Sequence, residues 1–222
     1  MQWLHLKSLI EQEYLRRSAT NPKLGWSFLY TPASALENAK VVLVGLNPRG
    51  DGEIDPEPKW EPECVNAYVD QPWGPGDQLN TLQKQVVLLF EALGVTKNEV
   101  FAANFVPFIS PSWTALADRN GALTLGRKIW TDLSAHTSAR LFVCLGKSVG
   151  REVAKLLGAE LKDKHLVEKW GRQTIDEYVA PCGRTVLGLP HLSRYQIFSS
   201  SRPSSAETVG RVARRVIGAP DC

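Results

Sequence analysis

The chain has 222 residues, of which 43% are hydrophobic and 22% are charged, and its formal net charge is +3. This length suffices for one hydrophobic core and is short for two, so we expect a single domain over residues 1–222. No apolar run reaches membrane-spanning length, and the first residues lack the basic-then-apolar pattern of a signal peptide. These features argue against a membrane protein, and we expect a cytoplasmic protein that is a monomer.

The cysteines give no sign of a metal site or of a disulfide framework. The chain has four of them, scattered without a C-x-x-C pair. Their spacing gives little support to a zinc or iron–sulfur site, and disulfides are rare in the expected compartment. The H-E-x-x-H signature of zinc hydrolases is also absent from the sequence. We therefore predict a protein without a metal or another cofactor.

The charges are distributed unevenly along the chain. Residues 50–77 contain eight acids and one lysine, a local net charge of −7. Residues 184–222 contain six arginines and two acids, a local net charge of +4. The basic end could serve a polyanion such as nucleic acid. A solvated helix face with scattered arginines accounts for the same charges equally well.

Helical and strand patterns alternate along the chain. Apolar spacing predicts an N-terminal helix at 3–16, which with an irregular lead-in fills residues 1–40. Residues 204–207 read as a capping box that opens a final helix. The fold expected is a three-layer α/β/α sandwich on a short, largely parallel four-stranded sheet. Between these ends we predict buried strands at 41–44, 100–106, 140–146 and 184–189, helices at 79–93, 114–135 and 148–157, and a poorly regular strand or hairpin within 159–182.

A long acidic segment at 51–77 separates the first predicted strand from the next helix. Five prolines between 56 and 75 make it too proline-rich for regular structure. Loops of this length in compact domains are usually functional or disordered. The aromatic residues Trp60, Tyr68 and Trp73 favour an ordered loop.

Polar side chains stand at the ends of three predicted strands. Asn47 follows the first strand, Asn104 ends the second, and His191 follows the last. Ligands of α/β proteins bind beyond the carboxyl ends of parallel strands, so these residues could share one site. Each also has a simpler explanation. Asn47 could be a turn residue, Asn104 a hydrogen-bonding residue at a strand end, and His191 a packed or surface histidine. A G-x-S-x-G elbow and a G-x-G-x-x-G turn are both absent, which argues against serine hydrolases and dinucleotide-binding enzymes.

Four short motifs stand at the strand ends. They are Gly-Leu-Asn-Pro at 45–48, Asn-Phe-Val-Pro at 104–107, Leu-Gly-Lys-Ser-Val at 145–149 and Pro-His-Leu-Ser-Arg at 190–194. Together, and in this order, they resemble the uracil-DNA glycosylase superfamily, and they are most similar to its mismatch-specific and single-strand-selective monofunctional branches. The resemblance covers residues 41–195 and implies the fold of that superfamily, DNA as the partner, and a DNA glycosylase that hydrolyses an N-glycosidic bond.

The resemblance implies a role for each of the three polar side chains. Asn47 orients the attacking water through its side-chain oxygen, and His191 donates a hydrogen bond to O2 of the departing pyrimidine. Asn104 binds the edge of the base, which such enzymes first remove from the DNA stack. The candidates for the aromatic ring under the base are Trp60, Tyr68, Trp73 and Phe105. The other base-binding residues implied are Gly45, Leu46, Pro48, Arg49, Phe105 and Trp73, and the residues implied to bind DNA are Lys147, Ser193, Arg194 and Tyr195.

The sequence departs from the family pattern in ways that concern the substrate. Arg49 stands where these branches usually have glycine, and the proline of the last motif precedes His191 rather than following it. A guanidinium offers several donors in a planar fork, which suits an oxygen-rich substituent or a phosphate. The acidic segment 51–77 is awkward for plain DNA but could accept hydrogen bonds from hydroxyl groups on a decorated base.

Three interpretations therefore remain open from the sequence. The first is a glycosylase that releases uracil, the family default, or a bulky 5-substituted pyrimidine such as hypermodified phage cytosine in antiviral defence. The second is a non-catalytic module that binds damaged or modified DNA. The third is hydrolysis of free nucleosides, which the arginine-rich end disfavours because it suits a polymer.

Overall fold

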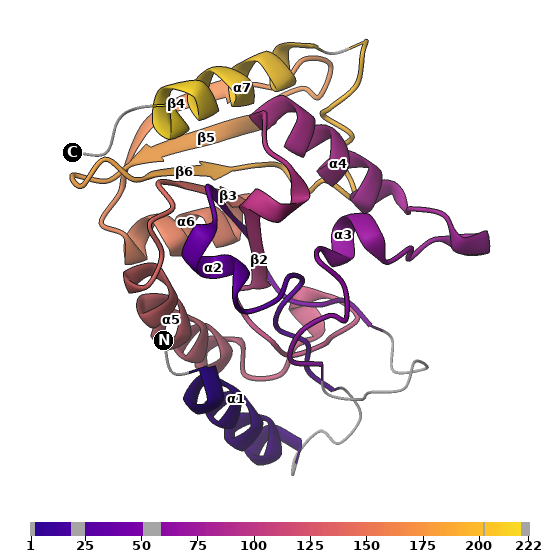
Figure 1. Cartoon of the computed structure of the whole chain (residues 1–222), viewed down its shortest axis with the longest axis vertical. Coiled ribbons are helices and arrows are strands. Elements are labelled where there is room, and N and C mark those ends of the chain that lie inside the picture. Colours follow the sequence, from indigo (N-terminus) through magenta and orange to yellow (C-terminus); the bar gives the residue numbers. More distant parts are fainter. Residues whose placement is uncertain (1–2, 19–24, 51–58, 202, 219–222) are drawn as a thin grey trace.

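A six-stranded sheet between two layers of helices forms the centre of the molecule (Figure 1). The computed structural model describes residues 3–18, 25–50, 59–201 and 203–218. The strand order is β2-β1-β3-β6-β5-β4, in which the first four strands are parallel and the last two are added antiparallel. The strands are β1 (Val41–Gly45), β2 (Val100–Asn104), β3 (Leu141–Cys144), β4 (Glu160–Leu166), β5 (Thr174–Val179) and β6 (Thr185–Gly188).

The predicted three-layer α/β fold is confirmed, whereas the predicted strand number of four was wrong. The four predicted strands form the parallel part of the sheet, and every one of their residues is buried. The additional strands come from the segment 159–182, which forms an antiparallel hairpin with a register shift between Leu161 and Asp163. Its strand β4 lies at the sheet edge, is exposed along nearly all its length and alternates acids with lysines. Charges of this kind protect an edge from pairing with other chains. They also leave the strand without the apolar run by which buried strands are predicted from sequence.

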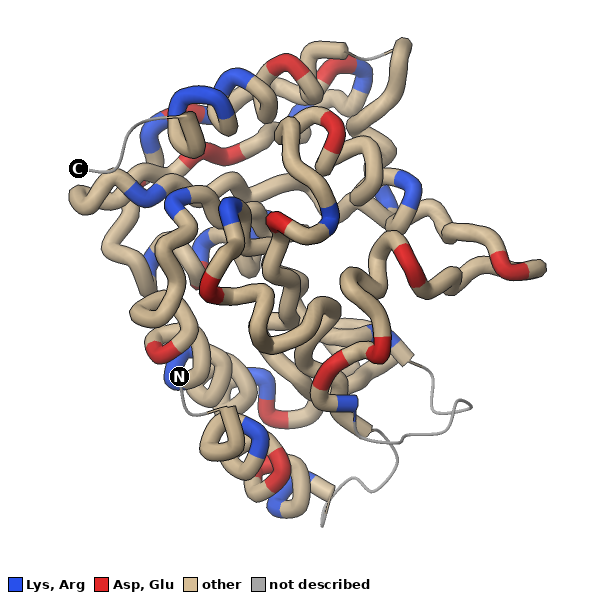
Figure 2. Tube along the Cα trace, in the orientation of Figure 1, with Lys and Arg blue, Asp and Glu red and all other residues tan. Residues whose placement is uncertain are grey.

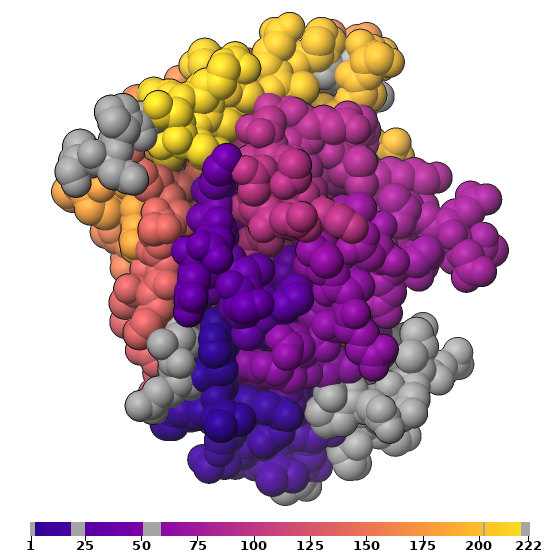
Figure 3. Space-filling view, in the orientation of Figure 1, coloured from indigo at the N-terminus to yellow at the C-terminus, as the bar shows by residue number. Residues whose placement is uncertain are grey.

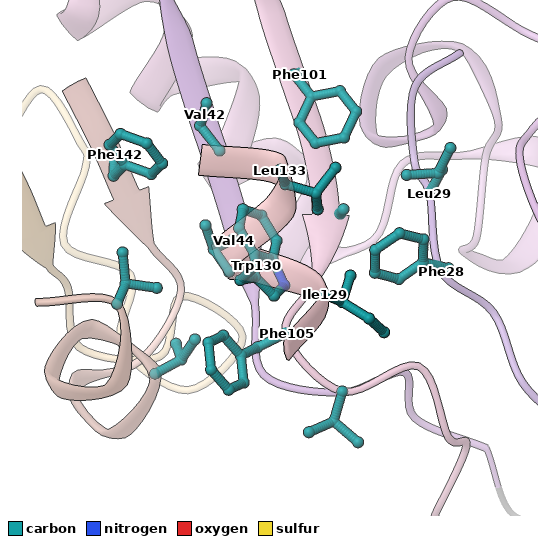
Figure 4. Close-up of a cluster of buried hydrophobic side chains, with 14 of the residues drawn as sticks. Phe28, Leu29, Val42, Val44, Phe101, Phe105, Ile129, Trp130, Leu133 and Phe142 are labelled. Carbon is teal, nitrogen blue, oxygen red and sulfur yellow. The ribbon is translucent and has the colours of Figure 1, made fainter. Parts of the chain in front are cut away.

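Helices cover both faces of the sheet, as the alternation of buried residues along β1 requires. Val42 and Val44 point to the layer of α1, α5 and α6, where Trp130 and Phe101 also lie (Figure 4). Val41 and Leu43 point to the layer of α4 and α7. The helices are α1 (Trp3–Ser18), α2 (Ala35–Asn38), α3 (Ala67–Asp70), α4 (Thr81–Leu93), α5 (Arg119–Ala135), α6 (Lys147–Leu156) and α7 (Pro203–Ile217), with 3-10 turns η1 (Pro75–Asp77), η2 (Lys97–Glu99) and η3 (Trp113–Ala115).

Two predicted helix starts were wrong, and local capping explains one of them. Helix α5 begins at Arg119 rather than at 114, because the Asp118 side chain accepts a hydrogen bond from the Gly121 amide and caps the helix there. Helix α7 already includes Pro203, a residue suited to a first helical turn. Ser204 therefore lies inside the first turn, and residues 204–207 do not form the capping box expected.

The described part of the acidic segment, residues 59–77, is folded onto the body of the protein. It contains the one-turn helices α3 and η1, although no regular structure was predicted there. Trp60 packs among Trp3, Trp26 and Phe28 beneath α1, with ring centroids 5.5–6.4 Å apart. The part of the chain around η1 protrudes from the surface beside α4 (Figure 3). Residues 51–58 lie outside the described residues.

Candidate active site

The parallel strands bring the predicted polar residues to one edge of the sheet. Gly45 and Asn104 are register partners at the ends of β1 and β2. Beyond them the two loops remain side by side, because the Phe105 and Val106 amides donate to the carbonyls of Gly45 and Leu46 at 2.7 and 2.8 Å. The same edge carries Gly146 after β3 and His191 after β6. The loop that follows the central strand is thus fixed along its length by backbone hydrogen bonds.

The side chain of Asn47 is held by its amide nitrogen. Nδ2 donates to the Ser110 hydroxyl at 2.8 Å, to the Pro48 carbonyl at 3.1 Å and to the Phe108 carbonyl at 3.3 Å. Two carbonyl acceptors at this end fix which end of the amide is nitrogen. Within the described residues no donor reaches Oδ1. The amide oxygen is therefore a fixed acceptor that remains available to a ligand or a water.

Ser110 is a site residue that the sequence analysis missed. It is 1% exposed, accepts a hydrogen bond from the Asn47 amide, and donates a hydrogen bond from its hydroxyl to the Ser112 carbonyl at 2.9 Å. Its backbone also pairs with the loop after β1, through the Pro48 carbonyl and the Gly50 amide. No motif marks this serine in the sequence. Only the parallel course of the two loops reveals that it positions Asn47.

Asn104 is nearly buried at the end of β2, at 2% exposure. Its Nδ2 donates to the Tyr30 hydroxyl at 3.2 Å and reaches the Ser27 carbonyl at 3.5 Å. Its backbone carbonyl accepts from the Trp130 indole at 3.1 Å. A Cβ atom on Gly45 would lie 2.4 Å from Asn104 Oδ1, so only glycine fits at the end of β1.

Three aromatic rings stand beside Asn104. Tyr30 and Tyr68 stack with centroids 4.9 Å apart, and Trp73 meets both rings edge-on at 5.7 and 5.1 Å. The cluster is anchored from α4 by Gln83, which is 0% exposed. Gln83 donates to the carbonyls of residues 67, 68 and 71, and it accepts from the amide nitrogens of Trp73 and Asn80. Burial, and less so Tyr30, raises the pKa of Tyr68 well above its usual value, so its hydroxyl stays protonated.

His191 lies exposed where the loop after β6 meets the loop after β1. Its Nδ1 is 2.8 Å from the Ser193 hydroxyl, and its ring approaches Gly146 at the start of α6. Although part of the ring is accessible, the surrounding protein lowers the pKa of His191 below 6.5, and the positive charge of Arg49 lowers it further. The imidazole is therefore neutral at pH 7.

Arg49 is exposed at this junction, and among the described residues it has no hydrogen-bond or ion-pair partner. Its backbone forms a bridge with Ser110, and its charge acts on His191. A cation without a counter-charge at the mouth of a site can take an anionic or oxygen-rich group of a ligand.

The remaining candidates for base contact differ in their surroundings. Phe105 is fully buried, with its ring parallel to that of Trp130, and it lies on the core side of the sheet end (Figure 4). Pro48 is buried and Leu46 half-buried. Trp60 belongs to the aromatic cluster beneath α1, whereas Trp73 is half-buried beside Tyr30 and Tyr68. Trp73 and Tyr68 are therefore the two stacking candidates that stand next to Asn104.

The residues implied to bind DNA fall into two environments. The Lys147 ammonium bonds to Thr174 and lies 3.5 Å from the buried Asp176 carboxylate, so its charge is partly neutralised. Ser193 and Arg194 are exposed after His191, and the Arg194 guanidinium lies over the Tyr195 ring at 5.6 Å. Tyr195 in turn meets Trp170 of the β4–β5 turn edge-on at 5.3 Å. The hairpin therefore supports the loop that follows His191.

The arginines of the basic end do not form one surface. Arg184 donates to the carbonyls of Ser134 and Thr137 near the end of α5, and Arg215 pairs with the buried Glu177 at 2.7 Å. Figure 2 shows cations along α7 and acids along the segment that contains α3 and η1. Of the predicted basic residues within the described ranges, Arg194 is the one on the loop after His191.

The described residues contain no group of three or more His, Cys, Asp or Glu side chains arranged to hold a metal ion. None of the helices in this part of the chain is long and apolar enough to cross a membrane. Whether a cofactor is needed is not decided by either observation, and its absence stays a prediction.

The fold and the site define an α/β protein with a ligand-binding edge at the carboxyl ends of its parallel strands. The family model for the Uracil DNA glycosylase superfamily matches residues 32–212, and the chain belongs to this superfamily. The predicted family is thereby confirmed, while its narrower placement among the mismatch-specific and single-strand-selective branches stays a prediction. A search among curated proteins finds no match to the chain. Superfamily membership supports a DNA glycosylase-type function and DNA as the partner.

Proposed function

We propose that the protein is a monofunctional DNA glycosylase that hydrolyses the N-glycosidic bond of a flipped-out pyrimidine. The observation that carries the proposal is the arrangement of Asn47. Three acceptors hold its amide nitrogen and leave the oxygen, among the described residues, as a fixed, unpaired acceptor at the carboxyl edge of the sheet. Such an oxygen can orient a water by accepting a hydrogen bond from it, and it does not need a charge to do so.

The water attacks the sugar carbon as the bond to the base breaks. Because the sugar develops oxocarbenium character, a weakly activated water suffices when it is held in line with the bond. The base leaves with both bonding electrons, so negative charge develops on the pyrimidine and reaches its O2 atom.

His191 is the candidate for stabilising that charge. When the Ser193 hydroxyl donates to Nδ1, the ring proton lies on Nε2, where it can donate to O2. The low pKa that burial and Arg49 give to this imidazole supports a neutral donor rather than a cation at pH 7. Removing one such donor typically lowers kcat by about 10²–10³-fold.

The base is either uracil or a bulky 5-modified pyrimidine, and Arg49 supports the second possibility. A guanidinium without a described partner stands near His191, where a small residue was expected from the resemblance. Its planar donors suit the oxygen-rich substituents of hypermodified phage cytosine. In that case the biological role is antiviral defence rather than DNA repair.

The test is base release, followed by mass spectrometry, from two DNAs. One DNA contains uracil and the other is phage DNA with hypermodified cytosines, and each is incubated with wild type and with Asn47→Ala. We expect a free pyrimidine from one of the two with wild type, and a loss of at least 100-fold in rate with the variant, whose DNA affinity stays unchanged. Release from neither DNA, with DNA binding retained, would instead support a non-catalytic module for damaged or modified DNA.

A further inference from the structure

The hydrogen bonds of Asn104 leave only one of its polar atoms for a ligand. Nδ2 has two protons, which point to the Tyr30 hydroxyl at 3.2 Å and the Ser27 carbonyl at 3.5 Å. The Ser27 carbonyl can only accept a hydrogen bond. The Asn104 amide therefore cannot rotate by half a turn without placing its oxygen against the Ser27 oxygen. Asn104 therefore presents Oδ1, an acceptor, at the end of β2, and a donor for the base must come from another residue.

Asn104 Oδ1 packs directly against residue 45, which leaves no room there for a side chain larger than that of glycine. The position that a Cβ of Gly45 would take lies 2.4 Å from Asn104 Oδ1 and 3.8 Å from the Tyr68 hydroxyl. Two polar atoms from separate elements, β2 and α3, thus border one spot at the end of the central strand.

The Tyr68 hydroxyl has no hydrogen-bond partner among the described residues. The residue is 4% exposed, and no other described residue makes a hydrogen bond with its hydroxyl. Its position is nevertheless fixed, because Tyr30 and Trp73 pack on the ring and the Asn66 side chain accepts from the Tyr68 amide at 3.1 Å. The oxygen is not one of the fully enclosed unpaired atoms of the described residues, so it reaches accessible space, where a ligand can meet it.

We propose that Tyr68 reads the base in the pocket by donating its hydroxyl proton, beside the carbonyl oxygen of Asn104, which Tyr30 holds in position. This inference rests on the proposed glycosylase function and names the residues that recognise its substrate. The Watson–Crick edge of a pyrimidine presents an N–H donor next to an acceptor. The N–H donates to Asn104 Oδ1 and the acceptor takes a hydrogen bond from the Tyr68 hydroxyl, so both unpaired oxygens gain a partner when the base enters.

The test uses free uracil and free cytosine, so it does not depend on catalysis or on DNA. Their binding is measured by calorimetry for wild type, Tyr68→Phe, Tyr30→Phe and Tyr178→Phe, the last as a control on β5. We expect wild type to bind at least one base, and Tyr68→Phe to bind it at least 10-fold more weakly. Because the hydroxyl has no partner in the protein, Tyr68→Phe keeps the Tm of wild type. If Tyr68 were purely structural, Tyr68→Phe would not weaken base binding while keeping the Tm of wild type.

Tyr30→Phe tests the positioning of Asn104. Without the phenol oxygen the amide keeps only its 3.5 Å contact with the Ser27 carbonyl and is held less firmly, so we expect the base affinity to fall, by less than in Tyr68→Phe. Wild-type binding of neither base would overturn the proposal, as would equal binding by wild type and Tyr68→Phe. Should Tyr68→Phe fold poorly, Gly45→Ala places a methyl group at the same spot, and undiminished base binding by that variant would also contradict the pocket. Failure of base release from DNA, with free-base binding intact, would count against the glycosylase function alone.

Discussion

Single hydrogen bonds decide which polar atom Asn47 presents. Asn47 is neutral, and in the proposed mechanism its role depends on which end of its amide faces the water. Ser110 provides the shortest of the three bonds that fix this end, at 2.8 Å, and its own proton is committed to the Ser112 carbonyl. A serine outside every motif therefore controls the orientation of the residue that the motif identifies.

Replacing Ser110 by alanine tests this dependence. We expect Ser110→Ala to lower kcat for base release by about 10-fold, since the remaining acceptors hold the amide less firmly. The affinity for DNA stays the same, because Ser110 is buried and touches no ligand. Kinetics under single-turnover conditions measure the effect. Ser112→Ala is the matched control, since its exposed hydroxyl bonds only to Thr114 and the Ala115 amide. Equal loss in both variants would contradict a specific role of Ser110.

The charge of His191 is set by its neighbours, which gives a second prediction at this scale. Its pKa in the folded protein lies below the value of 6.5 expected in the unfolded chain, first through burial and then through Arg49. The unfolded chain therefore binds the proton more tightly, and the protein loses stability as the pH falls from above 6.5 through the folded pKa. We expect Arg49→Leu to raise the pKa of His191 and to reduce this loss.

An NMR titration of the imidazole measures that shift directly. Arg211→Leu, a charge removal on the exposed face of α7, serves as the control and leaves the titration unchanged. An unaltered midpoint in Arg49→Leu would mean that the two side chains do not interact in solution.

At the scale of elements, α4 determines whether the aromatic cluster exists. Gln83 on this helix satisfies both its amide nitrogen and its oxygen with the backbone of residues 67–80. No hydrophobic contact could replace these bonds, since they pair buried and part-buried carbonyl and amide groups of a segment with little regular structure. The order of that segment therefore depends on one buried glutamine.

Gln83→Leu keeps the size of the side chain approximately and removes its bonds. We expect the free energy of unfolding to fall by about 1–3 kcal/mol or more, because several backbone groups are left buried and unpaired. Hydrogen exchange should accelerate in residues 66–73 before the rest of the protein. Lys84→Leu, at an exposed position of the same helix, is the control in denaturant titrations. Uniform exchange throughout the variant would contradict a local anchoring role.

The elements also explain which parts of the structure the sequence could predict. The four parallel strands are continuous apolar runs because both faces are buried, and their motifs gave Asn47, Asn104 and His191 with their shared edge. Strand β4 lacks such a run since it is an exposed edge. The roles of Ser110 and Gln83 depend on contacts between distant segments, which no local pattern records.

On the scale of the whole molecule, the exposed positive charges close to the candidate site are few. The acids of residues 59–77 stand near the site, while many of the C-terminal arginines are engaged within the protein or lie on α7 (Figure 2). Arg194 is exposed on the loop after His191, and the contacts of Tyr195 with Trp170 connect this loop to the β4–β5 hairpin. If the proposed function holds, we expect Arg194 to contribute a large share of the phosphate contact near the extruded base.

Arg194→Ala should therefore weaken DNA binding at every sequence tested, and the slope of log K against log salt should decrease by about one. Fluorescence anisotropy with a labelled duplex, repeated over a range of salt concentrations, measures both quantities. Lys128→Ala on α5 is the control, because this exposed lysine lies on a helix that packs away from the loop. If the two variants bind alike, the DNA does not reach the loop after His191. In that case the DNA strand would have to reach the same pocket by another path, past the acidic segment.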